Sequence, residues 1–144
     1  MSKTTEQLTQ TFNNNFVAYY RSHVAHVNIL GRNFQSDHTL LEGIYTSLQE
    51  QIDTIGELLR SLDDYMPCEI QDVLNQSEIG TGIFEEDADG FLYGVKDDLE
   101  KLKGTYEELM AVSELEGHEE IANYAQDRIL KLAKQIWMLT ATLS

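Results

Sequence analysis

Residues 26–57 read HVNILGRNFQSDHTLLEGIYTSLQEQIDTIGE, and this stretch decides both the fold and the candidate site. Its apolar residues recur every three or four positions, which is the period of an amphipathic helix. We predict a helix from about 36 to 64 that follows the connector GRNF and is capped at its start by Ser36 or Asp37. The apolar stripe consists of Leu41, Ile44, Leu48, Ile52, Ile55, Leu59 and Leu62.

Potential metal ligands occupy a different face of the same predicted helix. On a helical wheel with His38 at zero, Glu42 falls at about 40°, Asp53 at about 60° and Glu57 at about 100°, whereas the apolar stripe centres near 280°. His26, in the segment before, brings the candidate ligands to five. The alternative is a solvated face, which is the usual role of charged residues on an amphipathic helix.

The ligand stripe is too long for one metal ion. At about 1.5 Å of rise per residue, His38 and Glu57 lie roughly 28 Å apart along the axis. An identical helix packed antiparallel, with a two-fold axis between residues 47 and 48, brings His38 and Glu42 opposite Asp53 and Glu57 of the second copy. The spacing therefore predicts two equivalent metal sites between the subunits of a dimer.

Two further features favour this interpretation. Small residues on or near the stripe, Gly43, Thr46 and Gly56, permit close approach of a second helix. A mixed set of histidine and carboxylate ligands suits iron, whereas a structural zinc site more often includes cysteine. The ligand chemistry alone leaves zinc or manganese open as the metal.

Three more long segments show helical periodicity, at about 5–30, 91–115 and 119–143. The linker 65–90 contains the lone Pro67, a pattern around 70–74 that fits a small helix, and an acidic run with several glycines. A linker of this length fits a crossover along a bundle, so that the second and third long helices run in the same direction. We predict one all-α domain over residues 1–144, a ferritin-like four-helix bundle with a long crossover.

The charge of the chain limits its partners. The formal net charge is −15, from 25 acidic and 10 basic residues, and the basic residues are scattered. This disfavours nucleic acid, which needs clustered Lys and Arg, while an acidic surface attracts cations or serves only solubility. With one cysteine, Cys68, no leader-like N-terminus and no run of 18 apolar residues, we expect a cytoplasmic protein without a membrane segment.

The 26–57 stretch resembles the signature of the Dps-like mini-ferritins, in which H-x-N and G-x-N-F lead to H-x-x-x-D/E and D-x-x-x-E. The last predicted helix, with DRILKLAKQIWMLTATLS, is also similar to that family, and the third quarter of the chain is similar only weakly. The resemblance implies a hollow homododecamer in which Fe²⁺ is oxidised by hydrogen peroxide or O₂ and stored as ferric oxide. It implies ferroxidase centres made by His26, His38 and Glu42 of one subunit with Asp53 and Glu57 of its mate. A catalytically silent acidic scaffold that binds protein partners is the alternative function.

Aromatic positions differ from the family pattern. Val27 stands where the family often has a tryptophan, and Tyr45 on the ligand helix is a possible substitute or a packing residue. Trp137 fits the apolar pattern of the last helix and is predicted to be a core or interface residue. We interpret His23, one turn before His26, as a residue beside the metal ligands or an exposed one.

Two acidic segments remain. The junction before the last helix carries His118, Glu119 and Glu120, and the resemblance implies that this region lines a three-fold pore for iron entry; favourable charge at a helix N-terminus is the alternative. The run EEDADG at 85–90 has the acidic register of a calcium loop, but Lys96 stands where the bidentate glutamate is needed. We reject a calcium site there. The family's DNA binding depends on a lysine-rich terminus that this sequence lacks, so we expect no DNA binding.

Overall fold

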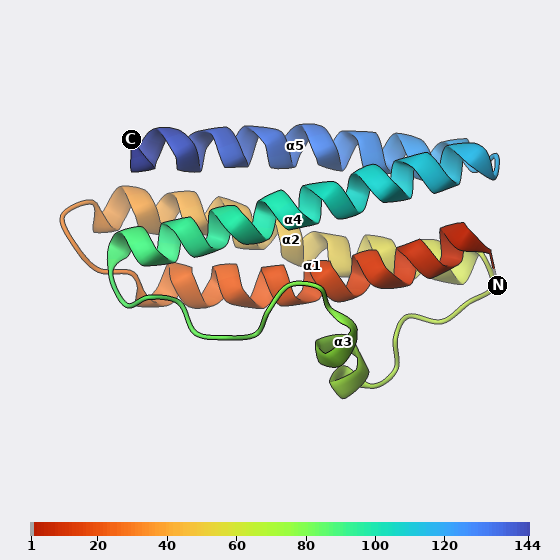
Figure 1. The fold of residues 1–144 in the computed structure, drawn as a ribbon, viewed down its shortest axis with the longest axis horizontal. Helices are drawn as coiled ribbons and strands as arrows, with labels where there is room; N and C mark the ends of the chain where they lie inside the picture. The colour runs from red at the N-terminus through yellow and green to blue at the C-terminus, as the bar shows by residue number, and fades with distance from the viewer. Residues whose placement is uncertain (1) are drawn as a thin grey trace.

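Four long helices and one short helix make up the computed structural model, which describes residues 2–144 (Figure 1). The long helices are α1 (Lys3–Asn28), α2 (Phe34–Ser61), α4 (Ala88–Leu115) and α5 (Glu119–Leu143), and the short one is α3 (Ile70–Gln76). The prediction of an all-α bundle with a short helix in its crossover is confirmed.

The chain direction follows from the loop lengths. A short turn reverses the chain between α1 and α2, and another does so between α4 and α5, so that each pair is antiparallel (Figure 1). The crossover carries the chain back along the bundle, and α2 and α4 consequently run the same way (Figure 1). The α1 helix packs against both α2 and α4, while α5 packs against α4.

The core is a continuous cluster of apolar side chains from all four long helices. Leu8, Leu48, Leu99 and Leu132, one from each helix, are fully buried, and each contributes about 1.5–3 kcal/mol by leaving water. Trp137 is not part of this core, because 65% of its surface is exposed. Within residues 2–144 no helix is long and apolar enough to span a membrane.

The start of α2 differs from the prediction. The helix begins at Phe34 with Asn33 at the cap position, so neither Ser36 nor Asp37 caps it. The connector makes a tight turn in which Gly31 has φ +120 and its carbonyl accepts from the Phe34 N–H at 3.1 Å, and the helix therefore starts two residues early. Asp37 is instead buried, and burial, together with the nearby Asp89 carboxylate, raises its pKa.

The acidic run at 85–90 begins α4 and does not form a calcium loop. The Asp87 side chain accepts from the Gly90 N–H at 2.6 Å, which caps the helix. A Cβ on Gly90 would lie 2.5 Å from the Glu85 carbonyl, so only glycine fits this turn. The aspartate and the glycine that resemble a calcium loop thus have a structural role at the start of α4.

A carboxylate from the α4–α5 corner caps the first helix. Glu116 accepts hydrogen bonds from the backbone N–H of Lys3 (3.3 Å), the N–H of Thr4 (2.8 Å) and the Thr4 hydroxyl. The Thr4 hydroxyl and N–H stabilise the charged form, and the pKa of Glu116 is lowered. The corner is therefore tied to the N-terminus of α1 by a contact that requires ionised Glu116.

We expect Glu116→Gln to lower the free energy of unfolding at neutral pH, because the amide keeps one acceptor and loses the charge. Because the pKa of Glu116 is lower in the folded state, ionised Glu116 stabilises the fold at pH values above the ordinary carboxyl pKa. This contribution is lost as the pH falls through the pKa of Glu116 in the folded protein. The difference between the wild type and the variant should therefore shrink below about pH 4.5, the unperturbed value. Denaturant titration at a series of pH values measures it, with Glu114→Gln on the same exposed corner as the matched control. A difference that stays constant down to the lowest pH would contradict this account.

Candidate metal centre

Two histidines hold each other in place where α1 ends and α2 begins. His26 Nδ1 lies 2.7 Å from the backbone carbonyl of His38, and His38 Nδ1 lies 2.7 Å from the backbone carbonyl of His26. The His26 carbonyl is in the last turn of α1, where backbone carbonyls have no N–H partner within the helix. The imidazole of His38 thus satisfies a helix end and fixes the angle between the two helices.

These hydrogen bonds also determine which ring nitrogens can bind a metal. A carbonyl oxygen only accepts, so each Nδ1 carries a proton, and in the neutral rings each Nε2 is left with a free lone pair. The two rings stack at 3.7 Å between centroids. In metal sites, a histidine ligand usually donates its second ring N–H to a carbonyl or carboxylate, and this hydrogen bond orients the ring. His26 and His38 are oriented in this way.

Glu42 completes a three-residue cluster with these rings. One ligand atom each from His26, His38 and Glu42 lies within 4.8 Å of the others, and His26 Nε2 is 4.0 Å from Glu42 Oε1. Donors bonded at about 2.1 Å to one ion are separated by at most about 4.2 Å, so the distance between His26 Nε2 and Glu42 Oε1 already fits a shared ion. Of the groups in residues 2–144, only this one meets the distance requirement for a metal site.

Asp53 and Glu57 lie on the exposed face of α2, one turn apart and away from the histidines. Their carboxyl groups are close enough that the pKa of Glu57 is raised, because protonated Glu57 donates a hydrogen bond to the Asp53 carboxylate and the charge of Asp53 disfavours a second negative charge. Two adjacent carboxylates of this kind repel each other, and a bound cation would relieve that repulsion. The structure of one subunit thus brings three of the five predicted ligands together and leaves the other two as a separate pair.

The small residues of α2 differ in their surroundings. A Cβ on Gly43 would meet nothing within 4 Å, and this position is open to a second helix. Gly56 is buried under Met66 of the crossover, with a Cβ placed 3.0 Å from its sulfur. Gly56 therefore packs against the crossover within the subunit and is less open to a second helix than Gly43.

Comparison with known proteins identifies the family. A family model described as a ferritin-like domain matches residues 5–144. Antigen TpF1 of Treponema pallidum is 34% identical over 143 residues, which cover 96% of this chain and 78% of that protein. The DNA protection during starvation protein of Helicobacter pylori is 27% identical, with 99% of both chains covered. The crystal structure of a Dps protein from Vibrio cholerae superposes with a TM-score of 0.92 at 26% identity, covering 99% of this chain and 89% of that one.

The chain belongs to the Dps family of the ferritin-like superfamily. The Vibrio cholerae protein is described as a ferritin-like diiron-carboxylate protein. In this Dps-family chain the His26, His38 and Glu42 cluster is a possible metal site.

The α4–α5 corner of this Dps-family chain carries the three residues singled out for a pore. His118 is the cap residue of α5, and Glu119 and Glu120 form its acidic first turn. His118 Nδ1 lies 3.8 Å from Glu120 Oε1. The corner lies at the end of the bundle opposite to the histidine cluster, close to the N-terminus of α1 (Figure 1).

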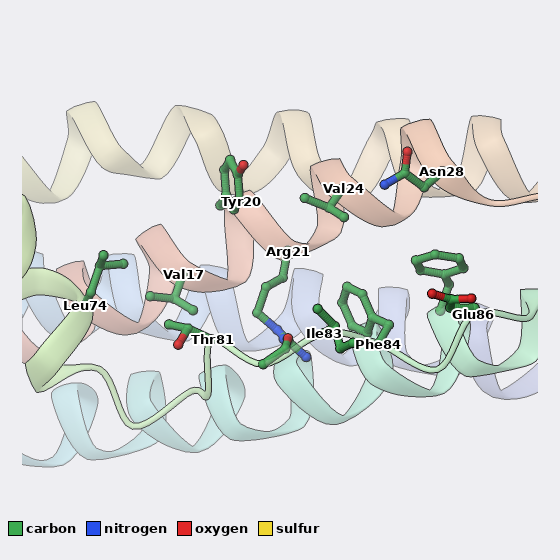
Figure 2. A pocket seen from close by; sticks show the side chains of 12 residues that line it. Val17, Tyr20, Arg21, Val24, Asn28, Leu74, Thr81, Ile83, Phe84 and Glu86 are labelled. Carbon is green, nitrogen blue, oxygen red and sulfur yellow. The ribbon is translucent and has the colours of Figure 1, made fainter.

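A separate hollow of about 440 Å³ lies between α1 and the crossover. Figure 2 shows Arg21 reaching from α1 toward the crossover beside Phe84. Its Nε donates to Asp98 at 2.6 Å, its guanidinium also contacts the Gly82 carbonyl, and it lies 4.2 Å from the centre of the Phe84 ring. Arg21 on α1 thus helps to hold the crossover and α4 against this helix.

Sequence reasoning missed how the aromatic residues around the histidines are arranged. His23 stacks on Tyr45 at 3.9 Å with 7° between the rings, and Tyr45 lies 5.0 Å from the His26 ring. The Tyr19 hydroxyl lies 3.1 Å from His23 Nδ1. The spacing of Tyr19 and His23 by one helical turn indicated that they could be in contact. The stacking of His23 on Tyr45 was not predictable, because it depends on how α1 and α2 are rotated relative to each other.

Proposed function

We propose that this protein is a ferroxidase that oxidises Fe²⁺ at sites shared between two subunits and stores the ferric product. His26, His38 and Glu42 of one subunit bind the ion together with Asp53 and Glu57 of the partner copy. The observation that carries the proposal is the histidine pair, because each Nδ1 is engaged by a backbone carbonyl and each Nε2 is free beside Glu42.

The ligand set explains why oxidation is favoured. Three carboxylates and two neutral imidazoles stabilise Fe³⁺ more strongly than Fe²⁺, since the extra positive charge is attracted by three negative ligands. Five protein donors leave room for an oxidant on the ion. Two Fe²⁺ ions and one hydrogen peroxide molecule then give two Fe³⁺ ions and two hydroxide ions, and O₂ is the alternative oxidant.

The two-fold arrangement follows from the separation of the half-sites on α2. Asp53 and Glu57 lie too far along the helix to reach the histidines of their own subunit. An antiparallel copy of α2 supplies them, with Gly43 as an open point of contact. Six such dimers form the hollow dodecamer, and His118, Glu119 and Glu120 line its three-fold pore for iron entry, as in the family.

Other ligands and partners are less well supported. Zinc or manganese bound in the same ligands remains the second candidate, since both accept histidine and carboxylate. A net charge of −15 disfavours binding to DNA. Protection of DNA by this protein is then chemical, through removal of Fe²⁺ and peroxide.

The test is anaerobic addition of Fe²⁺ to the metal-free protein, followed by peroxide or air, with ferric absorbance recorded and particle size measured by light scattering. We expect saturable Fe²⁺ binding and oxidation much faster than in buffer, in a particle near twelve subunits. Preincubation with Zn²⁺ should slow the oxidation by occupying the ligands. Oxidation no faster than in buffer would leave only the scaffold function.

A further inference from the structure

A groove of about 810 Å³ runs between α2 and α5. It forms because α5 packs closely along α4, whereas α2 and α5 lie further apart. Its volume is in the range of hollows that bind small organic molecules. The chain carries a net charge of −15, yet the groove is lined by Lys131 and Lys134 and by no acidic residue. The charge of its walls therefore favours an anion.

A buried cation lies beneath one end of this groove. Arg128 is 1% exposed, and its Nη1 donates at 3.2 Å to the Oγ of Ser47, a residue of the groove wall. Its Nε and Nη2 have no hydrogen-bond partner, and none of the ion pairs within residues 2–144 includes it. A buried charge without a partner is unfavourable, so a negative charge brought close to Arg128 is stabilised.

Ser47 connects this buried charge to the groove. Its oxygen accepts from Arg128, and its own proton makes no hydrogen bond within residues 2–144. A hydroxyl that accepts from a cation is a stronger donor, because hydrogen bonds in a chain polarise one another. The Ser47 hydroxyl can thus donate to a carboxylate oxygen that lies in the groove. On the α5 side, Lys131 pairs with Asp127 at 3.6 Å, but both side chains are 58% exposed, and such a pair is weak enough for the ammonium to bind a ligand instead.

The groove has an apolar wall beyond this cationic end. From Ser47 toward the start of α2, the wall includes Ile44 and Leu40, and Met138 lines the α5 side. Since α2 and α5 run in opposite directions and Arg128 contacts Ser47, Met138 lies further toward the start of α2 than Arg128 does. The cationic groups are thus gathered at one end and the apolar side chains extend away from them. A ligand that matches both parts has a negative head and an apolar tail.

We propose that the α2–α5 groove binds a single-chain carboxylate of the medium-chain fatty acid class, with its head between Ser47 and Lys131 and its tail toward Met138. The head gains charge-assisted hydrogen bonds, and the tail leaves water by covering the apolar wall. A bare oxyanion uses only the first contribution, and a neutral alcohol uses only the second. None of the proposed iron ligands lines the groove, so this site does not depend on the ferroxidase function.

The test is equilibrium dialysis of radiolabelled decanoate against the assembled, metal-free protein. Gly43, the proposed contact point of a second copy, also borders the groove, so the assembled particle is the relevant sample, and dialysis allows for slow entry. The groove variant carries Lys131→Gln and Lys134→Gln. The matched control carries Lys96→Gln and Lys103→Gln, which remove the same charge from α4, where each lysine pairs with a glutamate one turn away. Circular dichroism and light scattering check that both variants fold and assemble.

Competing ligands separate the contributions of the head and the tail. Acetate has the same charged group without a tail, decanol has the same tail without a charge, and inorganic phosphate is an oxyanion without a tail. A further variant, Met138→Glu, keeps both groove lysines and places a carboxylate beside the tail, at a residue that is 37% exposed. It tests the site even where the double lysine variant fails to assemble.

We expect saturable binding of about one decanoate per chain, since each chain has one such groove. Binding should be about tenfold weaker in the groove variant and in Met138→Glu, and unchanged in the α4 control. Acetate, decanol and phosphate should each displace decanoate only at much higher concentration than unlabelled decanoate does. No saturable binding to the wild type, or equal weakening in the groove variant and the α4 control, overturns the proposal. Displacement by phosphate as effective as that by decanoate also overturns it, because the groove would then recognise an oxyanion alone.

Discussion

His38→Ala and Asp53→Ala should each abolish rapid Fe²⁺ oxidation, and coexpression of the two variant chains in equal amounts should restore about a quarter of the wild-type activity. A variant chain that lacks His38 still offers Asp53 and Glu57 to its partner. A chain that lacks Asp53 still offers an intact cluster of His26, His38 and Glu42. Each mixed dimer therefore contains one intact site and one site that has lost both residues.

The quarter follows from random pairing, since about half of the dimers are mixed and half of their sites are intact. The matched control is coexpression of His38→Ala with His26→Ala, two changes in the same half-site, which leaves no intact site in any dimer. Activity is measured as ferric absorbance per chain, and mass spectrometry checks the mixing. Rescue by the control pair, or full activity in either single variant, would rule out the shared site.

The helices were predictable from the sequence because their cores depend on local spacing. Leu41, Ile44 and Leu48 face one way in any helix that contains them, and all three are buried in the bundle. The crossover was predictable from its length alone. The start of α2 was not predictable. Ser36 and Asp37 are both good capping residues, but the positive φ of Gly31 makes a tight turn after which the helix begins at Phe34.

The positions of the candidate metal ligands were predictable in part for the same reason. Glu42, Asp53 and Glu57 lie on one face of a helix whatever surrounds it. The contact of His26 with His38 required knowledge of how α1 meets α2, and here the family resemblance supplied what periodicity does not. Contacts between distant segments, such as Glu116 with Thr4 or Tyr45 with His23, left no signal in the spacing.

The interior of the bundle explains why iron should bind at its surface. Arg128 of α5 is 1% exposed, donates from Nη1 to Ser47 Oγ at 3.2 Å and lies 6.0 Å from the centre of the Tyr106 ring. Its Nε and Nη2 have no hydrogen-bond partner among residues 2–144. A buried guanidinium at this depth repels a metal cation. The carboxylates that we propose as ligands are on the exposed face of α2, where the proposed site needs a partner subunit.

Arg21→Ala should lower the free energy of unfolding by about 3–5 kcal/mol, the usual cost of leaving one member of a buried ion pair unpaired. The side chains of Arg21 and Asp98 are 16% and 8% exposed, and Nε lies 2.6 Å from the carboxylate. Burial already raises the pKa of Asp98 in spite of the guanidinium, so removing Arg21 leaves a mostly buried carboxylate without its hydrogen-bonded partner. The crossover also loses its contacts at Gly82 and Phe84.

Denaturant titration at a fixed chain concentration measures the loss, because assembly makes stability depend on concentration. Replacing both partners, as in Arg21→Met with Asp98→Leu, should recover most of it, since no charge is then left buried. Lys131→Ala is the control: Lys131 pairs with Asp127 one helical turn away at 3.6 Å, and both side chains are 58% exposed. Loss of this exposed pair should cost less than about 0.5 kcal/mol. Equal costs for Arg21→Ala and Lys131→Ala would mean that water reaches Asp98, and the crossover would then be held by its apolar contacts alone.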